Sequence, residues 1–318
     1  MVMQERRAPA GPNLFLVGAP KCGTTSLYEY LRVHPDIYFP FDSRLEPSTS
    51  NPGYWRCKEP AYFCTDLDLP PELSIKDEQV YLGLYAQAGA QKWRGDASAF
   101  YLYSSVAAER IKAFCPDARI LVTLRPPVEQ MHSWHNDFLH GSREDVTDFH
   151  EAVRLSARRR QGIGLPPKGV AGWMDYFGIA QYSVQIERYQ RLFGRERVKV
   201  VLLEDLAGHP AETYRSILEF LDVDPNFRPP FRIHNERPAE GKLELALYRI
   251  HSTPGFRQVS DRVFPYRLRR RVVETVRNLH ARHVATPRDP RDHVLRERCR
   301  PDVERLAHVI GRNLTHWL

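Results

Sequence analysis

Cysteine is scarce in this sequence of 318 residues: there are five, an odd number, and none shows the CxxC or Cys/His spacing of a zinc site. We therefore expect a reducing compartment rather than a disulfide framework. No apolar run approaches the roughly 20 residues that a membrane-spanning helix needs. The opening residues, MVMQERRAPAGPN, also lack the apolar stretch of a secretory signal. The predicted location is the cytoplasm, with no transmembrane segment.

Positive charge is concentrated in the last third of the chain. The 46 basic and 39 acidic residues give a formal net charge of +7, and residues 257–300 alone hold thirteen arginines against five acids. Such a segment suits an anionic ligand, an anionic polymer or a membrane surface, although a solvated helical face is the simpler explanation. A non-catalytic polyanion-binding module is therefore one alternative function. No RNA-binding, zinc-finger or helix-turn-helix signature accompanies the arginines, so nucleic acid is not an expected partner.

The order of apolar and polar segments predicts a single domain over residues 13–318, preceded by a disordered tail at 1–12 and ending in a basic, mostly helical part at 236–318. Short apolar runs predict buried strands at 13–17, 118–124 and 198–203. Residues 41–57 are predicted to form a loop. Helices are predicted at 24–33, 77–89, 106–114, 128–139, 148–160, 181–193 and 211–221. Strands that alternate with helices indicate an α/β fold, a three-layer domain with a parallel sheet.

A loop with two glycines, residues 18–26 (GAPKCGTTS), joins the first predicted strand to the first predicted helix. Such a loop presents backbone N–H groups and the positive end of a helix dipole to an anion. The Walker A loop, G-x-x-x-x-G-K-[ST], has a lysine where this chain has Thr24. Here the lysine is Lys21, between Gly18 and Gly23. A P-loop kinase or nucleoside triphosphatase is therefore an alternative that the missing Walker lysine opposes.

Several motifs together resemble those of sulfotransferases that use 3′-phosphoadenosine-5′-phosphosulfate (PAPS). Residues 20–27 (PKCGTTSL) resemble the family's 5′-phosphosulfate loop, and residues 125–133 (RPPVEQMHS) resemble its 3′-phosphate motif, R-x-P-x-x-x-x-x-S. Further elements of bacterial and carbohydrate-type members resemble residues 58–63 (KEPAYF), 95–102 (GDASAFYL) and 203–206 with 220–221. The resemblance covers about residues 13–235 and implies a P-loop NTPase-like parallel sheet flanked by helices.

The resemblance also implies a reaction: in-line transfer of a sulfuryl group from PAPS to a hydroxyl of a small metabolite or glycan, with 3′,5′-ADP as the product. The expected catalytic residues are Lys21, Glu59 as the base, and Ser133, although Glu59 could instead be a structural acid paired with Lys58. Arg125 and Ser133 would bind the 3′-phosphate, because a guanidinium matches phosphate geometry. No metal is expected, since lysine and arginine supply the cations. The loop residues expected to bind the donor are Pro20, Lys21, Cys22, Gly23, Thr24, Thr25 and Ser26.

Other polar residues near these motifs have structural explanations. His34, in a family-typical His-Pro pair, is predicted to be a helix-end residue rather than a base. His132 and His135 are predicted to lie on a solvated helix face, although either could touch a ligand. Glu204 and Asp205 are predicted to cap the next helix or to pair with basic residues.

The acceptor side is the least defined by sequence. Glycosaminoglycan-modifying members often carry a lysine where this chain has Ala97 and a proline where it has Ala99, which weakens the case for a heparin-like acceptor. The link at residues 38–57 is also longer than usual for the family. Cys22 would lie at a helix N-terminus, where a thiolate is favoured, but the family accepts Ser or Ala there. Four aromatic residues either line an acceptor pocket or fill the core: Trp55, Tyr62, Phe63 and Tyr101.

Overall fold

The computed structural model describes residues 11–41, 52–141, 143–231 and 289–318. Three predictions therefore fall wholly or partly outside the described residues. These are the disordered tail, the middle of the 38–57 link, and the basic C-terminal part before residue 289.

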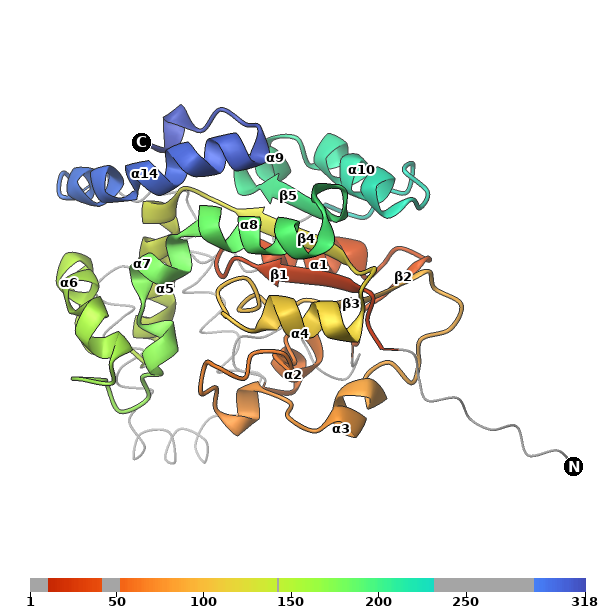
Figure 1. The fold of residues 1–318 in the computed structure, drawn as a ribbon, viewed down its shortest axis with the longest axis horizontal. Coiled ribbons are helices and arrows are strands. Elements are labelled where there is room, and N and C mark those ends of the chain that lie inside the picture. The colour runs from red at the N-terminus through yellow and green to blue at the C-terminus, as the bar shows by residue number, and fades with distance from the viewer. Residues whose placement is uncertain (1–10, 42–51, 142, 232–288) are drawn as a thin grey trace, which may run out of the picture.

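One parallel sheet forms the centre of the fold (Figure 1). It has five strands in the order β2-β3-β1-β4-β5, and every recorded pairing is parallel. The strands are β1 (Leu14–Gly18), β2 (Ile37–Tyr38), β3 (Trp93–Asp96), β4 (Arg119–Leu124) and β5 (Val198–Leu202). The predicted fold class, an α/β domain with a parallel sheet flanked by helices, is confirmed.

The helices of the described residues connect these strands and cover the sheet. They are α1 (Thr24–Leu31), α2 (Pro52–Lys58), α3 (Glu78–Gly83), α4 (Ala107–Phe114), α5 (Pro127–His140), α6 (Phe149–Arg160), α7 (Tyr176–Ala180), α8 (Tyr182–Phe193), α9 (Leu203–Gly208), α10 (Pro210–Leu221) and α14 (Asp292–Ile310). Short 3-10 turns occur at Pro71–Leu73, Ala171–Trp173, Arg195–Arg197 and Thr315–Trp317. None of these described helices combines the length and apolar composition needed to cross a lipid bilayer.

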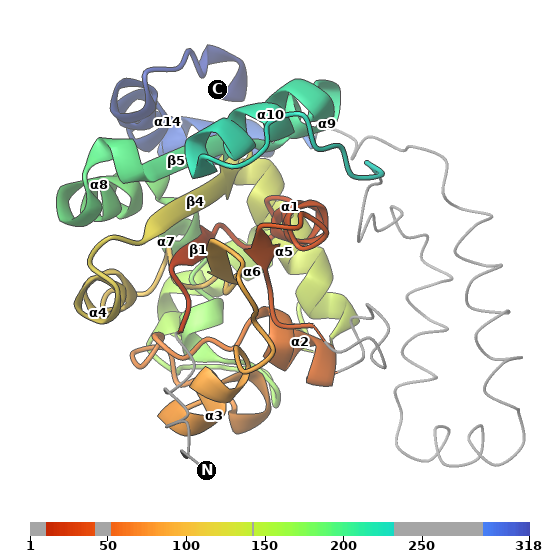
Figure 2. The same cartoon turned by 90° about the vertical axis from the view of Figure 1, so that its right-hand side faces the viewer.

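The strand residues alternate between two apolar layers, as the pleat of a buried strand requires. Leu14 and Leu16 of β1 pack with α1 and α10 on one face of the sheet. Phe15 and Val17 pack in the cluster that includes α4 and α8 on the other face. Figure 2 shows α1 and α10 on one side of the strands and α4 and α8 on the opposite side. The fold therefore has three layers, with β1 in the middle of the sheet.

Local sequence predicts most of these elements, with corrections at 41–57 and 77–89. The last part of the predicted loop is helix α2. Pro52 stands at its first helical position, where the missing backbone N–H of proline has no helical partner to lose. The predicted helix at 77–89 is only α3, since the hydrogen bonds from Leu84 and Tyr85 reach back three residues instead of four. Strands β2 and β3 and helices α7 and α9 were not predicted.

Helix α14 lies against α8 and α5. Asp302 accepts a hydrogen bond from Ser183 Oγ at 2.5 Å, and Arg305 pairs with Glu187. The guanidinium of Arg298 lies 3.6 Å from the centre of the Phe177 ring. These contacts join the end of the chain to the helical layer beside β4 and β5.

Candidate active site

The site begins where β1 and β4, neighbours in the sheet, both end. Ala19 donates a backbone hydrogen bond to Thr123 O at 2.7 Å, and the Thr123 hydroxyl donates to Gly18 O at 3.2 Å. These hydrogen bonds hold the loop after β1 against the C-terminal end of β4. Ligands of open α/β sheets bind at this carboxyl edge.

Both glycines of the loop are required by close packing. Gly18 has φ +150°, and a Cβ there would lie 2.5 Å from Ala99 O. Gly23 has φ +87°, and a Cβ there would lie 2.6 Å from Leu203 Cδ1. Helix α1 starts directly after Gly23, and its first backbone N–H groups have no partner within the helix. The loop and helix thus offer backbone donors to an anion.

Lys21 extends from this loop toward α5. Its backbone has φ +64°, the left-handed conformation that residues other than glycine rarely adopt. Its Nζ lies 3.0 Å from Asp137 Oδ1, and its carbonyl accepts a hydrogen bond from Arg125 Nη1 at 3.4 Å. Next to it, Pro20 O accepts from the buried Gln130 Nε2 at 3.2 Å. The lysine turn and the arginine segment, 104 residues apart in sequence, are therefore in direct contact.

Arg125 lies two residues before the start of α5 and contacts the Lys21 turn, and Ser133 lies within the helix. Arg125 Nη2 pairs with Glu129 Oε2 at 3.0 Å, whereas its Nε is buried and has no partner among the described residues. Ser133 is half-buried in the second turn of α5, four residues after Glu129 and four before Asp137. Residues at this spacing share one face of a helix. A buried guanidinium nitrogen without a partner is a donor available to an anion.

Glu59 reaches the same edge from the segment after α2. Its Oε2 accepts a hydrogen bond from Ala99 N at 3.4 Å, and Ala99 packs against Gly18. Its Oε1 lies 2.5 Å from Nζ of Lys58, whose side chain is fully buried. The pairing of Glu59 with Lys58 that the sequence left open is thus present, and it places a carboxylate beside the lysine loop.

A buried network around Asp96, at the end of β3, holds this segment in place. Asp96 accepts hydrogen bonds from Tyr81 and Tyr101, both at 2.8 Å, and from the Ser98 hydroxyl at 2.6 Å. Ser98 in turn accepts from Ala61 N at 2.9 Å. Burial raises the pKa of Asp96 to about 6, and the hydrogen bonds oppose that rise. The motif at residues 95–102 therefore anchors the Glu59 segment, a role that sequence analysis did not assign.

Comparison with known proteins identifies the family. The family model described as "Sulfotransferase family" matches residues 12–228, more than half of the chain. The chain belongs to the sulfotransferase family. The crystal structure of a sulfotransferase from Alicyclobacillus acidocaldarius is similar over 97% of this chain and 99% of that one, with 28% identity and a TM-score of 0.67.

Two curated sulfotransferases are also similar to part of the chain. Carbohydrate sulfotransferase 15 of Rattus norvegicus is 25% identical over 257 residues, which cover 67% of this chain and 44% of the relative. Bifunctional heparan sulfate N-deacetylase/N-sulfotransferase 1 of Mus musculus is 25% identical over 232 residues, covering 69% of this chain and 23% of the relative. The chain therefore spans less than half the length of these curated relatives.

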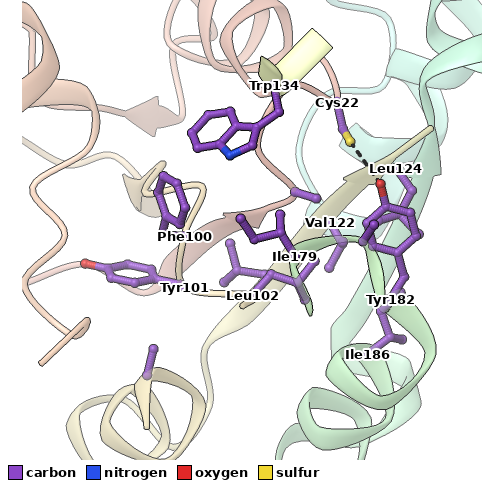
Figure 3. Close-up of a cluster of buried hydrophobic side chains, with 14 of the residues drawn as sticks. Cys22, Phe100, Tyr101, Leu102, Val122, Leu124, Trp134, Ile179, Tyr182 and Ile186 are labelled. Atoms are coloured by element: carbon purple, nitrogen blue, oxygen red, sulfur yellow. Dashed lines mark hydrogen bonds between the residues drawn. The ribbon is translucent and has the colours of Figure 1, made fainter. Parts of the chain in front are cut away.

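Cys22 is a core residue, and the prediction of a favoured thiolate is wrong. Its side chain is fully buried, and its Sγ lies 3.7 Å from the hydroxyl of Tyr182 (Figure 3). Burial raises the pKa of the thiol to about 11, more than the nearby Arg125 and Lys21 lower it. The thiol is therefore protonated at neutral pH.

The three histidines singled out by the sequence, His34, His132 and His135, have structural contacts. His34 lies just after α1, where its Nδ1 accepts from Asp36 N at 3.1 Å, which confirms the helix-end prediction. The solvated face predicted for the other two is wrong. His132 stacks on Phe149 and bonds the buried Asp292 at 3.0 Å, and His135 bonds Val146 O at 2.9 Å. Burial lowers the pKa of both His132 and His135.

The remaining described residues that the sequence singled out pack against the core or the C-terminal residues. Asp205 pairs with Arg312 at 2.8 Å and Glu204 with His316 at 2.7 Å, which confirms that these acids pair with basic residues. Phe63 and Tyr101 fill the core rather than a pocket. Tyr62 is half-buried and stacks on Tyr81. The side chain of Trp55 is not among those that the structure describes.

Proposed function

We propose that this sulfotransferase uses PAPS as its donor and transfers the sulfuryl group to a hydroxyl of a small metabolite or glycan. The observation that supports this most is the contact between the lysine turn and the arginine segment at one edge of the sheet. PAPS carries one anionic group on the 5′-oxygen and another on the 3′-oxygen of its ribose, so it needs two cationic places close enough for one nucleotide to bridge. A P-loop kinase would have the lysine of its Walker A motif at position 24, where this chain has Thr24.

The residues present fit such a donor. The N-terminus of α1 with Gly23, Thr24, Thr25 and Ser26 would hold the 5′-phosphate through backbone N–H groups and hydroxyls. Arg125, whose Nε is buried without a partner among the described residues, would hold the 3′-phosphate together with Ser133. Lys21, at the turn between these places, would face the oxygen that bridges phosphorus and sulfur.

Glu59 is the proposed base. As the acceptor oxygen bonds to sulfur, the bond from sulfur to the bridging oxygen breaks and its electron pair stays on that oxygen. Lys21 would stabilise this growing charge, and Glu59 would take the proton of the acceptor hydroxyl. Transfer of this kind depends mainly on positioning and electrostatics, by analogy with phosphoryl transfer.

The acceptor class rests on the relatives. One curated relative is named a carbohydrate sulfotransferase and another an N-sulfotransferase of heparan sulfate, and both names support a glycan acceptor. Against a polyanionic glycan stands Ala97, a fully buried alanine where glycosaminoglycan-modifying members often have a lysine. We therefore propose a glycan or small metabolite with few anionic groups.

The donor is tested by calorimetry and by transfer of label. We expect the protein to bind 3′,5′-ADP and to move ³⁵S from labelled PAPS to compounds of a metabolite and oligosaccharide extract. ATP with Mg²⁺ is the comparison ligand. Binding of ATP with indifference to 3′,5′-ADP would overturn the proposal.

Glu59→Gln is expected to lower turnover about 10²-fold, the usual contribution of a general base, while the affinity for 3′,5′-ADP is unchanged. Transfer rates and calorimetry measure the two effects separately. The variant deprives the buried Lys58 of its carboxylate, which costs stability. The double variant Lys58→Met/Glu59→Gln removes that charge as well, and Glu72→Gln, at an exposed site, is the matched control. A rate unaffected by Glu59→Gln in a folded protein would place the base elsewhere.

A further inference from the structure

Each cation proposed to bind the donor is paired with a carboxylate of α5. Lys21 Nζ lies 3.0 Å from Asp137 Oδ1, and Arg125 Nη2 lies 3.0 Å from Glu129 Oε2. Glu129 and Asp137 are eight residues apart, with Ser133 midway between them. All three share one face of the helix. One face of α5 therefore places a carboxylate at each of the two proposed anion sites.

The two pairs differ in strength. The side chains of Lys21 and Asp137 are 21% and 19% exposed, so water screens their attraction only in part. Glu129 is 59% exposed, and a pair this open contributes little. The turn that carries Lys21 is held by Arg125 and Gln130 through its carbonyls. Lys21 must therefore exchange Asp137 for a ligand by side-chain rotation, with the backbone in place.

We propose that Asp137 and Glu129 are internal counter-ions that compete with the donor, Asp137 at its 5′ end and Glu129 at its 3′ end. This inference rests on the proposed function. Each anionic end of the ligand has to displace a carboxylate from a cation before it gains the full charge interaction. A nucleotide with only one phosphate gains at one place and leaves the other pair closed. Each acid therefore lowers the affinity only for nucleotides whose phosphate takes its cation: Asp137 for those with a 5′-phosphate and Glu129 for those with a 3′-phosphate.

The test is calorimetry of the full chain with three ligands: 3′,5′-ADP, 5′-AMP and 3′-AMP, the weaker ones measured by displacement of 3′,5′-ADP. Asp137→Asn should raise the affinity for 3′,5′-ADP and 5′-AMP about tenfold, because it removes a weakly screened charge, and should leave 3′-AMP unchanged. Glu129→Gln should raise the affinity for 3′,5′-ADP and 3′-AMP only about twofold, because that pair is exposed. The gain from Glu129→Gln should also shrink further at high salt.

The matched control is Glu151→Gln on α6. Glu151 pairs with Arg154 at 2.6 Å on an exposed helix face, and its loss should change none of the three affinities. Thermal unfolding checks the fold of each variant, and Asp137→Ser is the second variant should Asp137→Asn unfold. Unchanged or weaker 3′,5′-ADP binding in folded Asp137 variants would overturn the counter-ion role. Absence of 3′,5′-ADP binding by the protein without substitutions would instead overturn the proposed donor.

Discussion

Lys21→Ala is expected to slow sulfuryl transfer by about 10²- to 10³-fold, the usual effect of removing one group that stabilises developing charge. The lysine Nζ would act most strongly on the bridging oxygen as the nucleotide leaves, so the loss falls mainly on kcat. The affinity for 3′,5′-ADP should fall by much less, because the backbone donors of α1 remain. Single-turnover transfer from labelled PAPS and calorimetry with 3′,5′-ADP measure the two effects.

Asp137 affects the donor affinity of the Lys21→Ala variant and provides a second test of the lysine. Without the lysine, the Asp137 carboxylate loses the cation at 3.0 Å and repels the donor. The double variant Lys21→Ala/Asp137→Asn removes this repulsion and should recover donor affinity without recovering the rate. Lys168→Ala, at an exposed lysine, is the control for the loss of one positive charge. A nearly normal rate in Lys21→Ala would exclude the proposed role of the lysine.

Arg125→Ala is expected to weaken 3′,5′-ADP binding by about 10- to 100-fold, as the loss of charge-assisted hydrogen bonds to a phosphate predicts. The effect should appear in KM for PAPS and should spare 5′-AMP, which lacks the 3′-phosphate. Calorimetry with 3′,5′-ADP and 5′-AMP separates these ligands. Equal losses for both ligands would mean that the variant has moved the Lys21 turn, whose carbonyl Arg125 also contacts.

Two further variants support the arginine test. Arg125→Lys keeps the charge but not the planar fork, and should restore only part of the affinity. Arg154→Ala removes an arginine that is paired on an exposed helix face, and should leave binding unchanged. Unaltered 3′,5′-ADP affinity in Arg125→Ala would move the 3′-phosphate site away from α5.

Elements with a strong local pattern could be predicted from the sequence. The strands β1, β4 and β5 are short, mostly apolar runs, and α8 and α10 have an amphipathic period. β2 has only two residues and β3 has the sequence WRGD, so neither shows a run of apolar residues or an alternation of apolar and polar residues. They are strands because neighbouring strands supply hydrogen-bond partners, which is a property of the folded sheet.

Inside the site, contacts distant in sequence escaped prediction. Asp137 and Gln130 lie on α5 within an ordinary helical pattern, and their partners in the lysine turn are more than 100 residues away. Cys22 has the local sequence of a reactive thiol, yet the packing of Tyr182 over it makes it a core residue. Local sequence carries no information about such burial, which depends on how α8 packs beside the sheet.

By itself, the order of residues determined the family, the alternation of strands and helices that indicates a parallel sheet, and the two segments proposed for the donor, because each is a pattern of residues close together in the sequence. Only the tertiary structure decided that Lys21 and Arg125 meet, that α5 supplies an acid to each, and that α14 returns to hold His132 through Asp292. The physical reason is that these pairings form between separate helices and loops, whose distance is set by the packing of side chains on the two faces of one sheet.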